Sequence, residues 1–318
     1  MGQKRLLPGV LPSKRRLDLF YRREGGGHGA KAPTPMVKVG LNVAAYSKDN
    51  GTTWILTAIP AGNWDNVTWI GDKYVAVGSP GPGSATAATS IDGINWVART
   101  IPQVQYTSLG ANGSIVVAAG AGGVISTSLD GITWTAQAPM DPVNIRKKIR
   151  WSSALGLFVG VSNGGAYSSA NGITWTLRSN LFIDSALAWS PDLGLFVGFQ
   201  GNAQTMYSSA NGTAWAAHAF IDTAFAAWVG AAWNGTVFAA IPNTNPARSA
   251  TSPDGINWTF GTSIASGANT SLTTSGTRFV GVGGNKVITS DDNGATWTSR
   301  VPASNAAWTA VASPTTGS

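Results

Sequence analysis

The chain has 318 residues, of which 43% are apolar and 11% charged, and it contains 40 glycines but a single glutamate, Glu24. The absence of cysteine excludes a disulfide framework and a thiolate metal site. No apolar run reaches the ~18 residues that a membrane-spanning helix needs, so we expect no membrane insertion. Many short apolar runs separated by Gly, Asn, Ser and Pro predict an all-β protein.

The formal net charge of +7 is concentrated at the N-terminus. Residues 1–38 contain nine basic and two acidic residues, whereas residues 39–318 contain twelve of each. The sequence therefore predicts two parts, a basic N-terminal arm (residues 1–35) and a nearly neutral body (residues 36–318). A pI near 9.8 would indicate nucleic-acid binding if it described the body, but it describes the arm.

The arm combines interrupted apolar residues with clustered arginines. Pro8 and Pro12 break its apolar start, which argues against a secretory signal. Leu17, Phe20 and Tyr21 would share one face of a short helix. We predict that the arm docks on a partner protein through Arg15, Arg16, Leu17, Phe20, Tyr21, Arg22 and Arg23.

The body repeats one segment, here called the box, seven times with a period near 40 residues, which indicates one repeated supersecondary unit. The first box is Ser47 to Trp54. Asp-Gly and Asn-Gly pairs predict two-residue hairpin turns with glycine at positive φ, and the first and last boxes predict slightly longer turns. We expect two sets of box residues to be structural: Asp49, Asp92, Asp130, Asn171, Asn211, Asp254 and Asp292, and Trp54, Trp96, Trp134, Trp175, Trp215, Trp258 and Trp297.

Each repeat is predicted to form four strands, with the box between the third and the fourth. In the second repeat these are residues 64–70, 73–78, 86–91 and 94–101. The other innermost strands are expected near residues 105–109, 149–154, 186–190, 229–233, 269–273 and 307–312. The N-terminal repeat has only three strands, at residues 36–40, 43–47 and 53–59. Pairing of residues 307–312 with residues 36–40 would complete it and remove exposed sheet edges.

The boxes resemble the Asp-box, or BNR repeat, Ser/Thr-x-Asp-x-Gly-x-Thr-Trp. Residues 47–54 and 290–297 match this pattern in full, and the other five copies are one residue short. Proteins of that family are β-propellers and include sialidases, sortilin-like receptors, photosystem assembly factors and phage virion proteins. The resemblance covers residues 36–318 and implies a seven-bladed β-propeller with four-stranded blades, but it leaves function open. WD40 and kelch repeats do not fit, because the Trp64-Asp65 pair is not repeated.

Propeller ligands often bind at the channel mouth, here expected on the face opposite the boxes. Asp184 and Asp222 occupy equivalent places in a repeated Phe-Ile-Asp segment. They could form a carbohydrate site or a paired-carboxylate hydrolase, or each could cap its own loop. The basic run from Arg146 to Arg150 could contact an acidic surface or be an ordinary solvated loop. The candidate ligand-face residues are Trp64, Tyr106, Arg146, Lys147, Lys148, Arg150, Asp184 and Asp222.

We expect no enzymatic activity, cofactor or metal. The resemblance implies that a sialidase would need three arginines and a tyrosine activated by glutamate, and the body contains no glutamate. His218 is its only histidine.

We predict a structural component of a bacteriophage virion, associated with the tail or the head-to-tail region and located in the phage particle. Its arm would anchor it to a neighbouring virion protein. Low charge and the arrangement of an arm and a repeat module support this prediction. A carbohydrate- or receptor-binding propeller that contacts a host-surface glycan remains an alternative, and a glycoside hydrolase using Asp184 or Asp222 is less favoured. Nucleic acid is a less favoured partner for the arm, because its start is rich in Leu and Pro.

Overall fold

The computed structural model of the protein describes residues 34–79, 86–102, 105–140, 147–201, 205–219, 227–244, 247–264 and 269–314. The chain divides into two units, Met1–Pro33 and Thr34–Ser318, and all described residues belong to the second. The predicted contact residues of the arm lie outside the described residues. Thr34 and Pro35 belong to the second unit rather than to the arm, and the Tyr74 hydroxyl donates a hydrogen bond to the Pro35 carbonyl.

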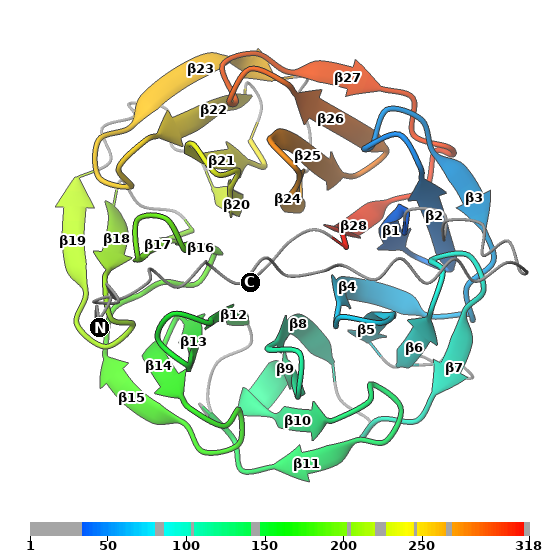
Figure 1. Ribbon diagram of the computed structural model, residues 1–318, viewed down its shortest axis with the longest axis horizontal. Helices are drawn as coiled ribbons and strands as arrows, with labels where there is room; N and C mark the ends of the chain where they lie inside the picture. Colours follow the sequence, from blue (N-terminus) through cyan, green and yellow to red (C-terminus); the bar gives the residue numbers. More distant parts are fainter. Residues whose placement is uncertain are drawn as a thin grey trace, which may run out of the picture. The chain divides into compact units, whose positions relative to one another are not determined.

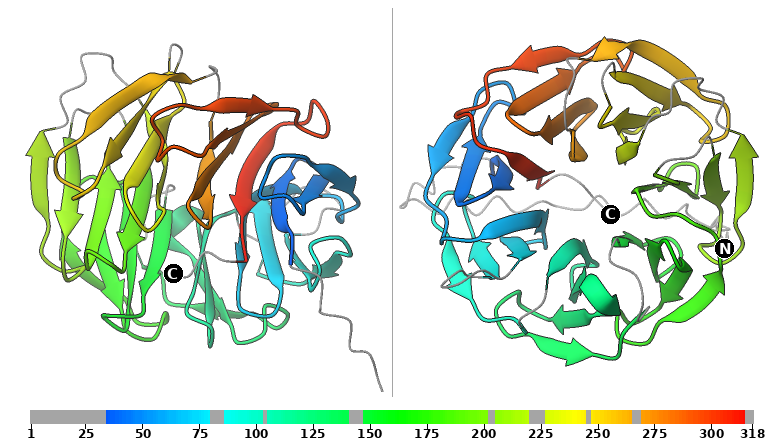
Figure 2. Two further views of the ribbon diagram at one scale, coloured as in Figure 1. Left: turned by 45° about the horizontal axis from the view of Figure 1, so that its top comes forward. Right: turned by 180° about the vertical axis from the view of Figure 1, so that it is seen from behind.

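Seven four-stranded antiparallel sheets form a closed ring around a central channel, which confirms the predicted seven-bladed β-propeller (Figure 1). Figure 2 shows the same ring from behind and from an oblique angle. In each blade the innermost strand lines the channel and the fourth strand lies at the rim.

Six blades are continuous in sequence. They are β4(Asn63–Trp69), β5(Tyr74–Ser79), β6(Ala87–Ser90) and β7(Val97–Arg99); β8(Tyr106–Ala111), β9(Val116–Gly120), β10(Ile125–Ser128) and β11(Thr135–Gln137); β12(Lys147–Ser152), β13(Leu157–Ser162), β14(Gly165–Ser169) and β15(Thr176–Ser179); β16(Ala186–Ser190), β17(Leu195–Phe199), β18(Thr205–Ser209) and β19(Ala216–Ala219); β20(Trp228–Trp233), β21(Phe238–Pro242), β22(Ala247–Ser252) and β23(Thr259–Ile264); and β24(Ser271–Ser275), β25(Arg278–Gly283), β26(Lys286–Ser290) and β27(Thr298–Arg300). A 3-10 turn, Ala121–Gly123, follows β9.

The seventh blade is composite, because it joins both ends of the described chain. Its strand order is β28(Trp308–Ala312), β1(Met36–Gly40), β2(Val43–Ser47) and β3(Ile55–Thr57). Strand β28 pairs antiparallel with β1, which confirms the predicted closure. A bulge interrupts this pairing at Gly40, where an added Cβ would lie 2.1 Å from the Ala307 carbonyl oxygen. Glycine is therefore required at this point of the closure.

The box turns are longer than the predicted two-residue turns. Thr89 pairs with Val97, so the whole box lies between the last paired residues of β6 and β7, and the fourth strand is shorter than expected. In the first box the corresponding pair is Tyr46 and Ile55, which makes that turn one residue longer, as predicted. Asn50 supplies the extra residue at positive φ before Gly51.

Side-chain hydrogen bonds explain why the box forms a fixed turn. In the blade β8–β11, Oδ1 of Asp130 accepts the backbone N–H groups of Ile132 at 2.8 Å and Thr133 at 2.9 Å. The Trp134 indole donates to the Gly131 carbonyl at 3.2 Å. The neutral side chain of Asn171 accepts the equivalent two backbone N–H groups, both at 2.9 Å. The turn therefore needs an acceptor oxygen at this position but no negative charge.

Each box glycine packs against the blade that precedes it. Gly131 has φ +71°, and a Cβ added there would lie 2.6 Å from Cγ2 of Val75 in β5. A Cβ added at Gly172 would lie at the same distance from Val117, and one added at Gly212 from Val159. The box is thus a turn within one blade and a contact between two blades.

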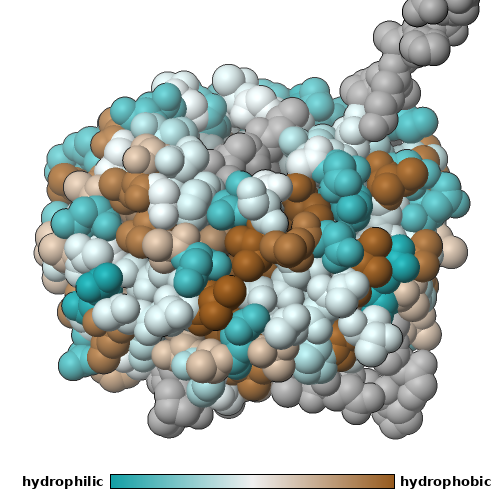
Figure 3. All heavy atoms as spheres, turned by 60° about the horizontal axis from the view of Figure 1, so that its bottom comes forward, coloured by the Kyte–Doolittle hydropathy of each residue, from teal (hydrophilic) through white to brown (hydrophobic). Residues whose placement is uncertain are grey.

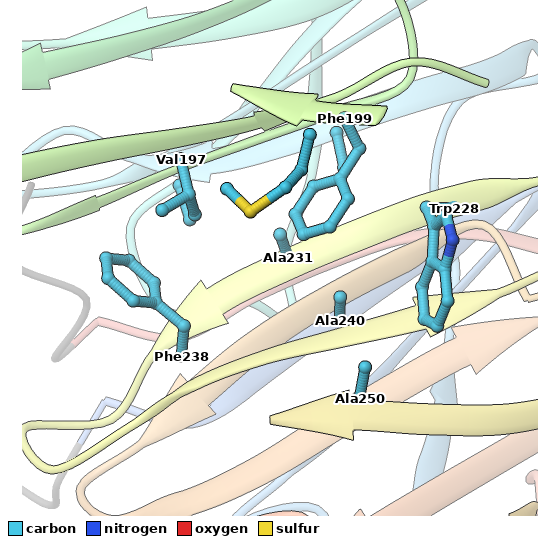
Figure 4. Close-up of a cluster of buried hydrophobic side chains, with 10 residues drawn as sticks. Val197, Phe199, Trp228, Ala231, Phe238, Ala240 and Ala250 are labelled. Carbon is cyan, nitrogen blue, oxygen red and sulfur yellow. The ribbon is translucent and has the colours of Figure 1, made fainter. Parts of the chain in front are cut away.

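The hydrophobic core is divided among the interfaces between blades. One cluster joins Val197 and Phe199 of β17 to Trp228, Ala231 and Phe238 of the next blade (Figure 4). Comparable clusters of Val, Ile, Phe and Ala fill the other interfaces. Burial of apolar area between blades is therefore the main source of stability of the ring.

The outer wall is mixed in character. Figure 3 shows one side of it, on which groups of apolar residues are interrupted by polar ones. Many exposed apolar side chains belong to the boxes and the rim strands, for example Leu129 and Ile91 in boxes and Val97 in β7, and others lie in loops, for example Phe182 and Val301. Within the described ranges, no helix is long and apolar enough to cross a membrane.

Candidate ligand site at the channel mouth

The alternation of antiparallel strands fixes which loops share a face of the ring. The boxes and the turns between first and second strands lie on one face. The loops that enter the innermost strands, and those between second and third strands, lie on the other face, here called the mouth. The sequence analysis placed its candidate ligand residues at the mouth.

A cavity of about 240 Å³ opens at the mouth. This volume lies below the ~300–1,000 Å³ typical of pockets for drug-sized molecules, so its size suits a small ligand. Five blades contribute to its lining, which consists of Thr107, Lys148, Asp184, Ser185, Val229, Asn243, Asn269 and Thr270. The structure therefore brings Lys148 and Asp184, two of the predicted residues, to one cavity.

Asp184 is held by a backbone hydrogen bond within its own blade. Its Oδ1 accepts the N–H of Gly201 at 2.8 Å. A Cβ on Gly201 would lie 3.2 Å from this oxygen, so the glycine permits the close approach. The contact is the loop-capping arrangement that the sequence offered as one alternative for Asp184.

Two side-chain oxygens beside the cavity lack a hydrogen-bond partner within the described part of the chain. Asn269 is 1% exposed, and its Nδ2 donates to the Pro242 carbonyl at 2.7 Å, while its Oδ1 accepts no hydrogen bond. The hydroxyl of Thr107 is also buried and without a partner. Buried polar atoms without partners cost stability, so they are expected where a ligand or water completes the bonding.

Lys148 also influences Asp65, which lies on the innermost strand β4, two blades away from β12. Burial raises the pKa of Asp65 above its ordinary value, although the hydrogen bond from Ser79 and the positive charge of Lys148 both lower it. The Ser79 hydroxyl donates to Oδ2 of Asp65 at 2.6 Å. The positive charge of Lys148, which lines the mouth cavity, thus also stabilises the ionised form of Asp65.

Two predicted ligand-face residues are not at the surface of the mouth. Trp64 and Tyr106 are both 0% exposed. The Trp64 indole donates to the Pro60 carbonyl at 3.1 Å, and the Tyr106 hydroxyl donates to the Pro102 carbonyl at 3.0 Å. They occupy equivalent positions at the start of an innermost strand, where they pack between blades and hold the preceding loop. Their role is structural.

From Lys147 onward the basic run forms a strand, so the solvated loop, one of the two alternatives that the sequence left open, does not describe these residues. Strand β12 begins at Lys147, and Lys148 and Arg150 line the central channel, whose cavity measures about 190 Å³. Burial lowers the pKa of Arg150, although a guanidinium remains charged at neutral pH. Its Nη1 donates to the Ile149 carbonyl at 2.9 Å.

Three further predicted residues stay untested. Arg146 and Asp222 lie outside the described residues, and only the backbone of Lys147 is described. The predicted pairing of Asp184 with Asp222 therefore remains a prediction. The single histidine of the body, His218, lies on the rim strand β19, bonds to Ser208 at 2.8 Å and does not line the mouth cavity.

Sequence reasoning missed two residues, Asn269 and Lys38. Asn269 lies in a short loop whose composition is ordinary, and the sequence contained no signal for its burial. Lys38 was counted with the charge of the arm, but it is a fully buried residue of β1. An alignment of the seven repeats could have identified it, because its position is apolar or small in every other blade.

No protein-family model and no curated protein sequence matches the chain. Similar solved structures include YCF48 bound to a D1 peptide, which is 19% identical with a TM-score of 0.57 and covers 76% of this chain and 81% of that chain. A putative 6-phosphogluconolactonase from Bacteroides fragilis is 11% identical with a TM-score of 0.65, covering 89% and 98%. The WD40 propeller domain of Doa1 is 12% identical with a TM-score of 0.58, covering 79% and 86%. At these identities the similarity shows the β-propeller fold alone.

Proposed function

We propose that the protein is a non-catalytic structural component of a bacteriophage virion, in which the propeller is a rigid module and the basic N-terminal arm docks on another virion protein. The observation that carries the proposal is the division of charge. Residues 1–33 hold eight basic and two acidic residues, and residues 34–318 hold thirteen and twelve. The resemblance of the boxes to the Asp-box of phage virion propellers supports the same assignment.

Use of the carboxylates as hydrogen-bond acceptors supports a non-catalytic role. Asp184 accepts a backbone N–H and Asp65 accepts a hydroxyl, so each has a structural task in its own blade. Catalytic carboxylates of glycosidases act as a pair across the scissile bond. Within the described residues, no second carboxylate lines the mouth cavity beside Asp184.

The proposal is tested by deleting residues 1–33 in the phage that encodes the protein and counting its copies per particle by quantitative mass spectrometry. We expect a folded propeller with an unchanged melting temperature that is lost from particles. Incorporation of the truncated protein at its normal copy number would contradict the proposal.

Two matched variants separate apolar docking from charge contacts. Replacement of Leu17, Phe20 and Tyr21 by Ser keeps every charge and is expected to abolish incorporation. If this variant assembles normally while reversal of the four charges at Arg15, Arg16, Arg22 and Arg23 does not, the arm binds by charge, and nucleic acid becomes the favoured partner.

A second candidate function is recognition of a host-surface glycan at the mouth. The mouth cavity favours it, because the oxygens of Asn269 and Thr107 and the amine of Lys148 are groups that bind sugar hydroxyls. The purified protein on a glycan array, followed by affinity measurements, tests this function. We expect Lys148→Met to lose at least about tenfold in affinity and the control Lys286→Met, on β26, to lose none.

The array also separates binding from hydrolysis. Recovery of an uncleaved glycan after long incubation supports a binding module, whereas a cleaved product that disappears in Asp184→Asn supports the glycoside hydrolase alternative. Absence of any bound glycan leaves the assembly role as the single proposed function.

A further inference from the structure

The interface between the composite blade and the blade β24–β27, here called the closing interface, contains a buried lysine. Lys38 is 0% exposed, and its amine lies 3.9 Å from the centroid of the Trp308 ring and 4.7 Å from that of Trp54. The surrounding cluster is apolar and consists of Met36, Ala45, Trp54, Val280, Val282, Val287, Trp308 and Val311. The amine has no hydrogen-bond partner within the described part of the chain.

The other six blades provide an internal comparison for Lys38. In each blade one residue at the first or second position of the second strand pairs with the serine of the box, as Met36 pairs with Ser47, and this pairing aligns the repeats residue by residue. The residues equivalent to Lys38 are Ala76, Ala118, Gly160, Gly198, Ala240 and Gly281. A long cationic side chain therefore occurs at a position that elsewhere accepts only Ala or Gly.

The closing interface also differs at a second position. Ala303 precedes Trp308 by five residues, and the equivalent positions before Trp64 and Tyr106 are Ile59 and Ile101. These isoleucines pack into the clusters of their own interfaces, and Ala303 packs against the cluster of the closing interface. The closing interface thus has a smaller side chain at this position, and it also contains the amine of Lys38.

Neighbouring charges do not neutralise the amine. The charged residues on the elements packed against it are Lys48, Asp49, Arg278, Lys286, Asp291 and Asp292, and Asp292 accepts hydrogen bonds from its own box. Arg278 and Asp291 pair with each other at 2.5 Å, and Asp49 accepts hydrogen bonds from its own box. Burial alone lowers the pKa of Lys38 to about 7. The indole N–H of Trp308 is a second buried donor without a partner at this interface.

We propose that the closing interface is a pH-sensitive closure of the ring, at which proton uptake by Lys38 favours separation of the composite blade from β24–β27. Separation exposes the amine to water, so the open form binds a proton more tightly than the closed form. Linkage then makes opening more frequent as pH falls from about 10 toward 7 and levels off below that range. Strand β1, which follows the arm in sequence, belongs to the blade that this opening separates from β24–β27.

The absence of native cysteine allows a matched pair of reporters. Ala45 in β2 and Ala88 in β6 occupy equivalent positions, and both are 0% exposed. Ala45 belongs to the closing interface and Ala88 to the interface between the composite blade and β4–β7. Single Ala45→Cys and Ala88→Cys proteins are labelled with a thiol reagent between pH 7 and 9.5. Each rate is divided by the rate of an unfolded peptide that carries the same cysteine.

We expect labelling of Ala45→Cys to increase by up to about tenfold per unit decrease in pH, with no such dependence for Ala88→Cys. Adding Lys38→Met should abolish the dependence, and adding Lys286→Met should leave it unchanged. Equal pH dependence at both reporters would mean that Lys38 acts only through global unfolding, which overturns the proposal. Persistence of the dependence in Lys38→Met overturns it as well. If Ala45→Cys does not fold, amide exchange of β1 and β28 in the native chain, measured with and without Lys38→Met, decides the same question.

Discussion

The contact of each box with the preceding blade can be tested at Gly131. Substitution by alanine has two separable effects. A non-glycine residue at φ +71° is strained by about 1–2 kcal/mol. The new Cβ would also lie 2.6 Å from Cγ2 of Val75, and overpacking of a tight core costs about 1–3 kcal/mol more. We therefore expect Gly131→Ala to lower the unfolding free energy by about 2–5 kcal/mol.

Gly113 provides the matched control in the same blade. It also has positive φ, at +85°, but an added Cβ would meet nothing within 4 Å. Gly113→Ala should therefore show the backbone strain alone, about 1–2 kcal/mol. Urea denaturation followed by tryptophan fluorescence measures both variants, and the difference between them isolates the contact between blades. Equal losses of stability would refute the role of the box as a contact between blades.

Four further predictions concern the boxes, the closure and Lys38. Asp130→Asn should change the unfolding free energy by less than about 1 kcal/mol, whereas Trp134→Ala should lower it by about 3 kcal/mol. Urea denaturation measures both variants. Similar effects of the two substitutions would contradict a purely structural role of the Asp130 carboxylate. Deletion of residues 305–318 removes β28 and should lower the melting temperature and expose the edge of β1 to association, visible by light scattering; an unchanged monomer would refute the closure. Lys38→Met should raise the unfolding free energy at pH 7 by about 2–4 kcal/mol, because the desolvation penalty of about 3–5 kcal/mol exceeds the cation–π stabilisation of about 0.5–2 kcal/mol. The unfolded lysine has pKa 10.5, so the increase in unfolding free energy should vanish near that pH. An increase that is independent of pH would be contrary evidence. Although burial raises it, hydrogen bonds within the turns hold the pKa of the box carboxylates below its ordinary value, in Asp92 at about 2. The contribution of these carboxylates to stability is therefore present above about pH 4 and is lost between pH 4 and 2. Thermal melts should lack this loss in a variant with Asn at all five box aspartates, which are Asp49, Asp92, Asp130, Asp254 and Asp292.

The fold was predictable because the box is a local signal repeated seven times. Its Asx–Gly pair marks the turn between the third and fourth strands, and the turn fixes the register of the strands on both sides. Closure was predictable from counting, because β28 has no partner in sequence and the N-terminal repeat lacks an innermost strand. Turn length was less predictable, since the serine and the acid of each box use hydrogen bonds that extend the loop beyond the Asx–Gly pair.

The candidate site was less predictable because both faces of an innermost strand are buried between blades. In such strands the alternation of side chains does not distinguish core from ligand face. Trp64 and Tyr106 lie at the start of these strands, and their large apolar rings fill the interfaces between blades. Lys148 and Arg150 also lie on an innermost strand but line the channel. Composition alone could not distinguish these channel residues from the buried Trp64 and Tyr106. The burial of Asn269 depends on a contact with the carbonyl of Pro242, 27 residues away in sequence.

Departures from the repeat provide an argument that applies to the whole ring. Seven equal blades offer seven equal places for a partner or ligand, so a specific function requires residues that make one blade different. At the position that pairs with the equivalent of Val39, Lys148 is the single charged member, and the residues of the other six blades are Asn66, Ser108, Ala186, Gly230, Ser271 and Ala310. The residues that pair with the equivalent of Val37 are Ala, Thr or Gly, and Arg150 is again the single charged member.

Lys38 is the third departure of the same kind, at a position that is Ala or Gly in the other six blades. None of the three cations supports a contact that the remaining blades need in order to fold, because those blades form the same sheets without one. Two of them place positive charge in one sector of the channel, and the third places it in the interface that closes the ring. The distinct behaviour of this propeller is therefore expected from the channel beside β12 and from the closing interface, whereas the box face is expected to behave alike in all seven blades.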